Sequence, residues 1–495
     1  MKNNKGRFFP SWLLFAVSLP LLLTACVTVG PDHQPPTPEL PAQWSETKGT
    51  VTSGNDQTLS HWWTLFQDPR LNALIARAMA GNPDMRMAGT RIRESRAALR
   101  LAIAGGLPAI DTGLSYTTNR KGERSNDDGD TQDLFQANFD AAWEIDLFGG
   151  NRRRVAAAEA SLMATVEDRR DTCVSLTAEV ARNYLELRAS QQRLAIAREN
   201  SRTQEQTVDL VRNKFQIGLG TELEVAQAET LLAQTAAQIP GLDSAAQQAM
   251  HQLAILLGQQ PHALKAELSQ PGPMLPVPPH LPITLPSELL RQRPDIRSAE
   301  RQLAAATATV GAATAELFPR FSLGALIGLQ SSSLSELISR SSRFWTVGPA
   351  IRWNLFDAGS TRAVIETSEA RRERAQLLYE KTVLTALTDT ENALVALDRE
   401  QTTRTHYQEA VTASQRAVLI ARGQYKAGIT TFLNVLQSEN ALYQSQDKLA
   451  LSDQRLGLQM IALYKALGGG WQETLPPDSV SLSTTSSPFL VRNAP

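Results

Sequence analysis

The sequence predicts a mainly α-helical protein with a smaller membrane β part, and it predicts that both parts are built twice. The first observation is an internal repeat, because residues 215–232 return as residues 425–442, 210 positions further along the 495-residue chain. The two copies share identical residues at this offset: Gly218/Gly428, Thr221/Thr431, Leu223/Leu433, Val225/Val435, Gln227/Gln437, Glu229/Glu439 and Leu232/Leu442. This period is too long for a solenoid repeat, so each copy is a large half of the molecule.

Further landmarks repeat in the same order and support this division. They are Asn82-Pro-Asp-Met-Arg86 and Arg293-Pro-Asp-Ile-Arg297, Leu107-Pro108 and Phe318-Pro319, and Leu147-Phe-Gly-Gly150 and Leu355-Phe-Asp-Ala358. The second observation is a pair of very long helical patterns, and the third is a set of four short segments with alternating polarity. Each is justified below in chain order.

The N-terminus has the pattern of a secretory signal, which we assign to residues 1–25. Lys2, Lys5 and Arg7 precede an apolar run over residues 12–23, which is shorter than the ~20 residues of a spanning helix. Leu23-Thr-Ala-Cys26 follows and looks like a bacterial lipobox, so we expect Cys26 to be lipidated and residues 26–60 to form an extended tether. The alternative is a soluble secreted protein in which Cys26 occurs by chance.

Charge and cysteine content exclude several functions. Removing residues 1–25 takes three of the 49 Lys and Arg residues and none of the 50 acids, which leaves a net charge of −4. This mild balance gives no reason to expect nucleic acid as a partner. Once Cys26 carries lipid, only Cys173 remains, so no intrachain disulfide is possible, and its place on a helical stripe predicts a packed apolar role.

Residues 151–215 predict one long helix, and residues 361–424 repeat the design. Apolar residues recur every three or four positions in a narrow stripe typical of coiled coils: Cys173, Leu176, Val180, Tyr184, Leu187 and Leu194. Each long helix should end at its glycine and return through residues 222–239 or 432–467. The expected elements are therefore coiled-coil hairpins over residues 151–240 and 361–467.

Four segments alternate with the period of two that β-strands require. We place strands at about residues 110–118, 134–147, 320–330 and 344–355. In the second, Phe135, Phe139 and Trp143 face one way while Asp140 and Glu144 face the other. An apolar face opposite a polar face over about ten residues is typical of outer-membrane barrel strands. Pro349 cannot donate to a ladder, so we expect it to mark a bulge or a local break.

Four strands are too few to close a barrel around a water-filled channel. Open sheet edges are excluded from lipid because unpaired backbone groups cost several kcal/mol each there. If the strands span a membrane, several chains must therefore share one barrel. A sandwich in a soluble domain is the competing interpretation, and the polar loops and flanking long helices count against it.

The remaining segments complete the division of the chain. Residues 61–270 form the first repeat, and the Pro-rich residues 271–284 form an equatorial linker between the repeats. The second repeat covers residues 285–470, and residues 471–495 form an equatorial C-terminal tail. The sequence has no H-E-x-x-H, P-loop, G-x-S-x-G or C-x-x-C motif, so we expect no enzyme activity, no catalytic residue, no metal site and no cofactor.

Taken together, these motifs resemble the TolC/OprM outer-membrane factors, and more narrowly their NodT-type lipoprotein branch. The resemblance rests on the lipobox, Trp62-Trp63, Asp68-Pro69, Asn82-Pro-Asp84, Leu285-Pro-Ser-Glu-Leu-Leu-Arg-Gln-Arg-Pro-Asp-Ile296, Phe318-Pro319, Val347-Gly-Pro349 and Leu355-Phe356. It implies a homotrimer with one twelve-stranded barrel in the outer membrane and a helical tunnel in the periplasm. It also implies a periplasmic adaptor (membrane fusion protein) and an inner-membrane pump as partners, usually of the resistance–nodulation–division type.

The resemblance also assigns roles to single residues. It implies a periplasmic gate at Glu224, Tyr425, Asn434 and Gln437, where Tyr425 bonds Glu224 on the neighbouring hairpin. Asn434 and Gln437 replace acids that often form charged rings in the family. The hairpin-tip residues expected to contact the adaptor are Gly218, Leu219, Gly428 and Ile429. If the strand phase is right, the residues lining the barrel lumen are Asp140, Glu144, Asp146 and Arg352.

The expected function is passive conduction of drugs and toxic small molecules out of the cell from a tripartite pump. Two alternatives stay open: an exit channel for protein secretion, and a structural lipoprotein rod that spans the envelope. Strand alternation distinguishes the duct from the rod, because a rod has no need of four amphipathic strands.

Overall fold

The computed structural model describes residues 28–45, 59–120, 131–276 and 286–471, so the expected signal and Cys26 lie outside the described residues. The elements of the first repeat are η1 (Trp62–Phe66), α3 (Pro69–Gly81), α4 (Pro83–Ala104), β1 (Ala109–Arg120), β2 (Thr131–Ile145), α5 (Gly150–Gln216), α6 (Glu222–Ala236), α7 (Ile239–Leu256) and α8 (Lys265–Leu268). Those of the second are α9 (Pro286–Gln292), α10 (Pro294–Ala315), β3 (Arg320–Ser331), η2 (Leu334–Glu336), η3 (Arg340–Ser342), β4 (Arg343–Arg352), α11 (Ser360–Lys426) and α12 (Phe432–Ala466). Helices, two strands and a long hairpin therefore occur twice in the same order, as the repeat predicts.

The chain forms two compact units. One contains the sheet, with residues 90–166 and 298–381 and the N-terminal segment as far as Pro38. The other contains residues 39–89, 167–297 and the chain from Thr382 onward. Among the described residues, no helix is both long enough and apolar enough to cross a membrane.

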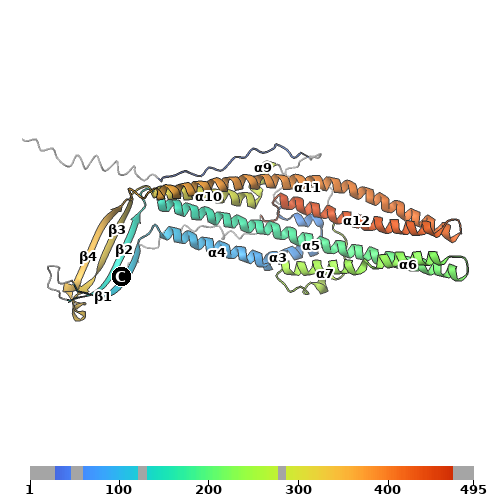
Figure 1. The fold of residues 1–495 in the computed structure, drawn as a ribbon, viewed down its shortest axis with the longest axis horizontal. Coiled ribbons are helices and arrows are strands. Elements are labelled where there is room, and N and C mark those ends of the chain that lie inside the picture. The colour runs from blue at the N-terminus through green and yellow to red at the C-terminus, as the bar shows by residue number, and fades with distance from the viewer. Residues whose placement is uncertain (1–27, 46–58, 121–130, 277–285, 472–495) are drawn as a thin grey trace, which may run out of the picture. The chain divides into compact units, whose positions relative to one another are not determined.

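The four strands form one antiparallel sheet in the order β1-β2-β3-β4 (Figure 1). The register places Phe139 opposite Thr112 and Ile327, and Ile327 opposite Trp345, so the apolar residues of all strands share one face. The expected alternation is therefore confirmed, including its phase. In the chain by itself this apolar face is open, and Leu114 and Trp345 are 82% and 74% exposed.

Two expectations about the strands are wrong. β2 ends at Ile145 and β4 ends at Arg352, each earlier than the alternation suggests, because the turn into the following helix takes over. Pro349 marks no bulge, since the β3–β4 pairing runs one to one from Arg320↔Arg352 to Leu329↔Arg343. β4 has a single neighbour in this chain's sheet, and proline is tolerated on such an edge strand.

The hairpins follow the predicted plan with one difference. α5 and α11 each span 67 residues and turn at Gly218 and Gly428. The second return, α12, is one continuous helix of 35 residues, whereas the first return stops at Ala236 and restarts as α7. Pro240 lies in the first turn of α7, where its missing N–H costs nothing, and it favours a new helix start at this point.

The main apolar core surrounds Trp62, whose ring stacks on Tyr464 with 5.3 Å between centroids. Asp68 begins α3 by accepting hydrogen bonds from the backbone N–H groups of Arg70 and Leu71, at 2.8 and 3.3 Å. Its other carboxylate oxygen accepts from the Tyr184 hydroxyl at 2.7 Å, which ties the start of α3 to α5. Cys173 is buried in this core, as expected.

Candidate functional site: hairpin tips, sheet face and repeat junctions

The two hairpin tips have the same backbone turn. Gly218 and Gly428 adopt φ of 74° and 72°, which favours glycine, and their N–H groups donate to the carbonyls of Phe215 and Tyr425. The next residues, Leu219 and Ile429, are each 74% exposed. The structure therefore presents one exposed apolar side chain at each tip.

Tyr425 is buried just above the second tip. Its hydroxyl has no hydrogen-bond partner among the described residues. Burial raises the pKa of Tyr425, and the negative charge of Glu224 raises it further. The Lys214 ammonium lies 4.0 Å from the centre of the Tyr425 ring and donates to the Tyr425 carbonyl at 3.1 Å. This cation therefore neutralises the C-terminal end of α11, where carbonyls lack partners.

Glu224 is engaged by its own helix. Its Oε2 accepts from the Thr221 N–H at 2.9 Å, and its own N–H donates to Thr221 Oγ1 at 3.3 Å, which completes a capping box at the start of α6. No hydrogen bond joins Glu224 to Tyr425 within the described chain. The sequence reasoning missed this role, although the Thr-x-x-Glu spacing is its usual signal.

Asn434 and Gln437 are both exposed on α12. Asn434 Nδ2 donates to Thr430 Oγ1 at 2.7 Å, so α12 begins without the capping box of α6. Gln437 lines a groove of about 420 Å³ between α6 and α12. The other lining residues are uncharged: Leu223, Ala226, Gln227, Thr230, Leu231, Gln234, Leu436 and Asn440.

The polar face of the sheet carries three of the four predicted lumen residues. Asp140 pairs with Asp111 across β1 and β2, Glu144 pairs with Ser322, and Arg352 pairs with Arg320. Like charges opposite each other are unfavourable in a sheet, so Asp111 belongs to the same charged face, although we did not predict it as a site.

Asp146 does not lie on this face of the sheet. It follows the end of β2, and its Oδ2 accepts from the Arg152 N–H at 2.8 Å at the start of α5. The predicted strand position of Asp146 is wrong, because the unpaired N–H groups at a helix start attract a carboxylate.

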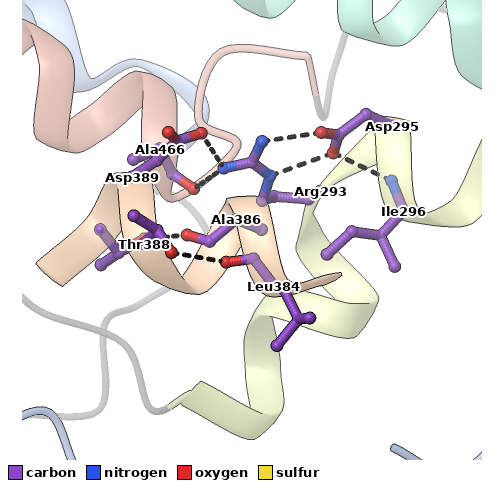
Figure 2. Close-up of polar contacts among 9 residues, drawn as sticks. Arg293, Asp295, Ile296, Leu384, Ala386, Thr388, Asp389 and Ala466 are labelled. Carbon is purple, nitrogen blue, oxygen red and sulfur yellow. Dashed lines mark hydrogen bonds and ion pairs between the residues drawn. The ribbon is translucent and has the colours of Figure 1, made fainter. Parts of the chain in front are cut away.

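Sequence reasoning also missed the polar cluster around Arg293. Its guanidinium donates to both Asp295 oxygens, at 3.0 and 2.7 Å, and to the Ala466 carbonyl at 2.9 Å, as Figure 2 shows. Asp389 lies 3.5 Å from the same guanidinium. Arg293 thus ties the junction of α9 and α10 to the C-terminal end of α12.

The first repeat makes the same connection with a different residue. Asn82 lies at the junction of α3 and α4, accepts from the Asp84 and Met85 N–H groups, and donates to the Leu256 carbonyl at the end of α7. Gly258 and Gly468, at φ of 70° and 72°, pack against these two junctions. The repeated Pro-Asp motif therefore marks an equivalent joint in both halves.

A cavity of about 490 Å³ lies beside Arg293. Asp171, Asn392, Gln459 and Lys465 contribute polar groups to its lining. Burial raises the pKa of Asp171 and the charge of Asp295 raises it further, whereas Arg293 acts in the opposite direction. No cluster of His, Cys, Asp and Glu with the spacing of a metal site occurs among the described residues.

Comparison with known proteins decides the family. The sequence model described as outer membrane efflux protein matches residues 74–259 and 285–469. The chain belongs to the outer membrane efflux protein family. This efflux protein is 32% identical over 466 residues to nodulation protein T of Rhizobium leguminosarum bv. viciae, covering 93% of this chain and 94% of that protein. The NodT-type resemblance is therefore confirmed.

Two further comparisons agree with the fold. The pyoverdine export outer membrane protein OpmQ of Pseudomonas aeruginosa (strain ATCC 15692 / DSM 22644 / CIP 104116 / JCM 14847 / LMG 12228 / 1C / PRS 101 / PAO1) is 33% identical to this efflux protein, over 91% of this chain and 96% of that protein. The solved outer-membrane channel OprN superimposes with a TM-score of 0.84 at 36% identity, covering 90% of this chain and 99% of that channel. The mainly helical fold with a strand-built part is thus the fold of an efflux channel.

Proposed function

We propose that this efflux protein is the exit duct of a tripartite pump, and that three copies conduct drugs and other toxic small molecules passively to the exterior. The observation that carries the proposal is the sheet, which is apolar on one face and has a free edge at β1 and another at β4. Lipid cannot satisfy such edges. If β4 of one copy pairs with β1 of the next, three copies close a barrel of twelve strands without any edge.

The helices next to these edges support the same arrangement. α4 leads into β1 and carries Leu101, which is 76% exposed, while α11 follows β4 and exposes Leu377 and Leu384. Exposed apolar side chains on both helices are typical of surfaces that a neighbouring copy covers. In this assembly the polar sheet face, with Asp111, Asp140 and Glu144, lines the lumen and disfavours anions.

The other parts of the proposal follow from the family resemblance. Lipidated Cys26 anchors the chain to the outer membrane. The tips at Gly218, Leu219, Gly428 and Ile429 contact a periplasmic adaptor, which connects the duct to an inner-membrane pump of the resistance–nodulation–division type. Asn434 and Gln437 line the gate, and the unpartnered Tyr425 hydroxyl bonds an acid of the adjoining hairpin when the gate is closed.

The test is to purify the full chain in detergent and record its K⁺ conductance in planar lipid bilayers. We expect a trimer whose conductance rises several-fold in the double variant Tyr425→Phe with Glu224→Ala. Glu222→Ala is the matched control, because Glu222 is a neighbouring acid in the same helical turn. A stable monomer, or a protein that never conducts, would refute the duct, and an unchanged double variant would remove these two residues from the gate.

A further inference from the structure

α5 carries a row of polar residues that contact the second hairpin of the same chain. They are Arg193, Asn200, Thr207 and Lys214, each seven positions after the one before. A spacing of seven keeps residues on one side of a helix in a coiled coil. We call this row the polar stripe. Each member has a printed partner in α11 or α12, so the stripe joins two hairpins that are about 210 residues apart in sequence.

The upper part of the polar stripe contacts α12. Arg193 donates from Nε and Nη2 to the two carboxylate oxygens of Asp447, at 2.7 and 3.1 Å. This paired geometry fixes the orientation of both side chains. Asn200 Nδ2 donates to Gln446 Oε1 at 2.8 Å. The two contacts therefore set the height of α12 relative to α5.

The lower part of the polar stripe is buried and ionic. Glu439 on α12 is 5% exposed, and its Oε1 accepts from Thr207 at 2.9 Å and from Arg422 Nε at 2.8 Å. Three helices therefore meet at one carboxylate. Separating them would leave a desolvated charge without its partners, which is strongly unfavourable. Lys214 completes the stripe through the carbonyl of Tyr425 on α11.

Apolar residues lie between the members of the polar stripe, among them Leu194, Ala197, Val208 and Val211. An apolar seam alone tolerates sliding, because one aliphatic contact replaces another at little cost. Polar and ionic partners of differing kinds fix the register, since a shift by one turn mismatches all of them.

We propose that the polar stripe clamps the two hairpins of one chain into a single rigid unit. The clamp itself rests on the contacts within the chain, whereas its consequence rests on the proposed function. If the lower end of the duct opens, the hairpins of one chain move together, and the separation occurs between neighbouring chains.

The test measures the distance between the two tips of one chain. Spin labels are attached at Leu219→Cys and Ile429→Cys, which are both exposed, while Cys173 is buried. Labelled chains are diluted with unlabelled chains so that each assembly holds one labelled copy. Pulsed electron–electron double resonance should give one narrow distance distribution in the otherwise unchanged protein.

Variants decide the cause of the narrow distribution. Replacing Thr207, Glu439 and Arg422 together by Val, Leu and Leu removes the ionic cluster without leaving a buried charge, and we expect the distribution to broaden at least twofold. Asn200→Leu with Gln446→Leu provides a second, milder variant. The matched control is Arg202→Met, which removes an exposed ion pair with Glu199 on the same helix.

The outcomes are separable. A broad or two-peaked distribution in the otherwise unchanged protein overturns the clamp. The clamp is also overturned if both stripe variants fold and keep the narrow width, and folding is checked by helix content and assembly size. A protein that gives narrow distances but never conducts ions would refute the exit duct and leave the clamp in place.

Discussion

Replacing Gln204 by leucine should stabilise the lower part of the long hairpin. Gln204 lies on α5, its side chain is 3% exposed, and neither its amide nitrogen nor its amide oxygen has a hydrogen-bond partner among the described residues. A buried polar atom without a partner costs about 1–3 kcal/mol. Leucine has a similar size and no polar atom, so the substitution removes both penalties while the cavity stays filled.

The expected magnitude follows from these two atoms. Taking about 1 kcal/mol for each gives a gain of ~2 kcal/mol in the free energy of local unfolding. Because 1.4 kcal/mol is a factor of ten in an equilibrium constant, backbone amides around residue 204 should exchange hydrogen about 30 times more slowly. Hydrogen exchange followed by mass spectrometry of peptides from this part of α5 measures the effect directly.

Gln206→Leu is the matched control, because Gln206 is an exposed glutamine two residues further on the same helix. Its exchange should stay within about twofold of the unchanged protein, since exposed substitutions usually change stability by less than 0.5 kcal/mol, which is roughly a factor of two. Faster exchange in Gln204→Leu would mean that the buried amide makes a stabilising bond, and the reasoning from its missing partners would be refuted.

Three further predictions concern other parts of the chain. Asn434→Glu should create at Thr431 the capping box that α6 has and α12 lacks, slowing exchange at the second tip in line with a gain of ~1 kcal/mol; unchanged exchange would contradict it. Asp171→Asn should be more stable than the unchanged protein at neutral pH. The raised pKa of Asp171 makes the unfolded state lose its proton first, so stability falls as pH rises from about 4 through the folded pKa, whereas the variant should show no such loss in denaturant titrations across this window. Gly30→Ala should release the N-terminal segment to proteolysis, because Gly30 has φ of 88° and an added Cβ would lie 2.3 Å from the Cα of Gly311; a segment that stays protected would argue against this close contact.

Local pattern determined a large part of this fold. The period-two alternation of residues 134–147 and the heptad stripe from Cys173 to Leu194 identified strands and long helices, because these periods follow from the geometry of each element alone. The repeat at Gly218 and Gly428 located both tips, since the turn requires a left-handed residue. These features need no knowledge of which segments meet in space.

Contacts between distant residues were decided only by the tertiary structure. Arg293 looked like part of a motif, yet its partner is the Ala466 carbonyl, 173 residues away. Thr207 and Glu439 are 232 residues apart, and their sequence surroundings do not indicate a pair. Glu224 and Asp146 seemed available for a gate and a lumen, but each serves the start of a helix. Periodicity specifies the face on which a residue lies, whereas its partner depends on how whole elements pack, and that is settled by burial and charge neutralisation across the fold.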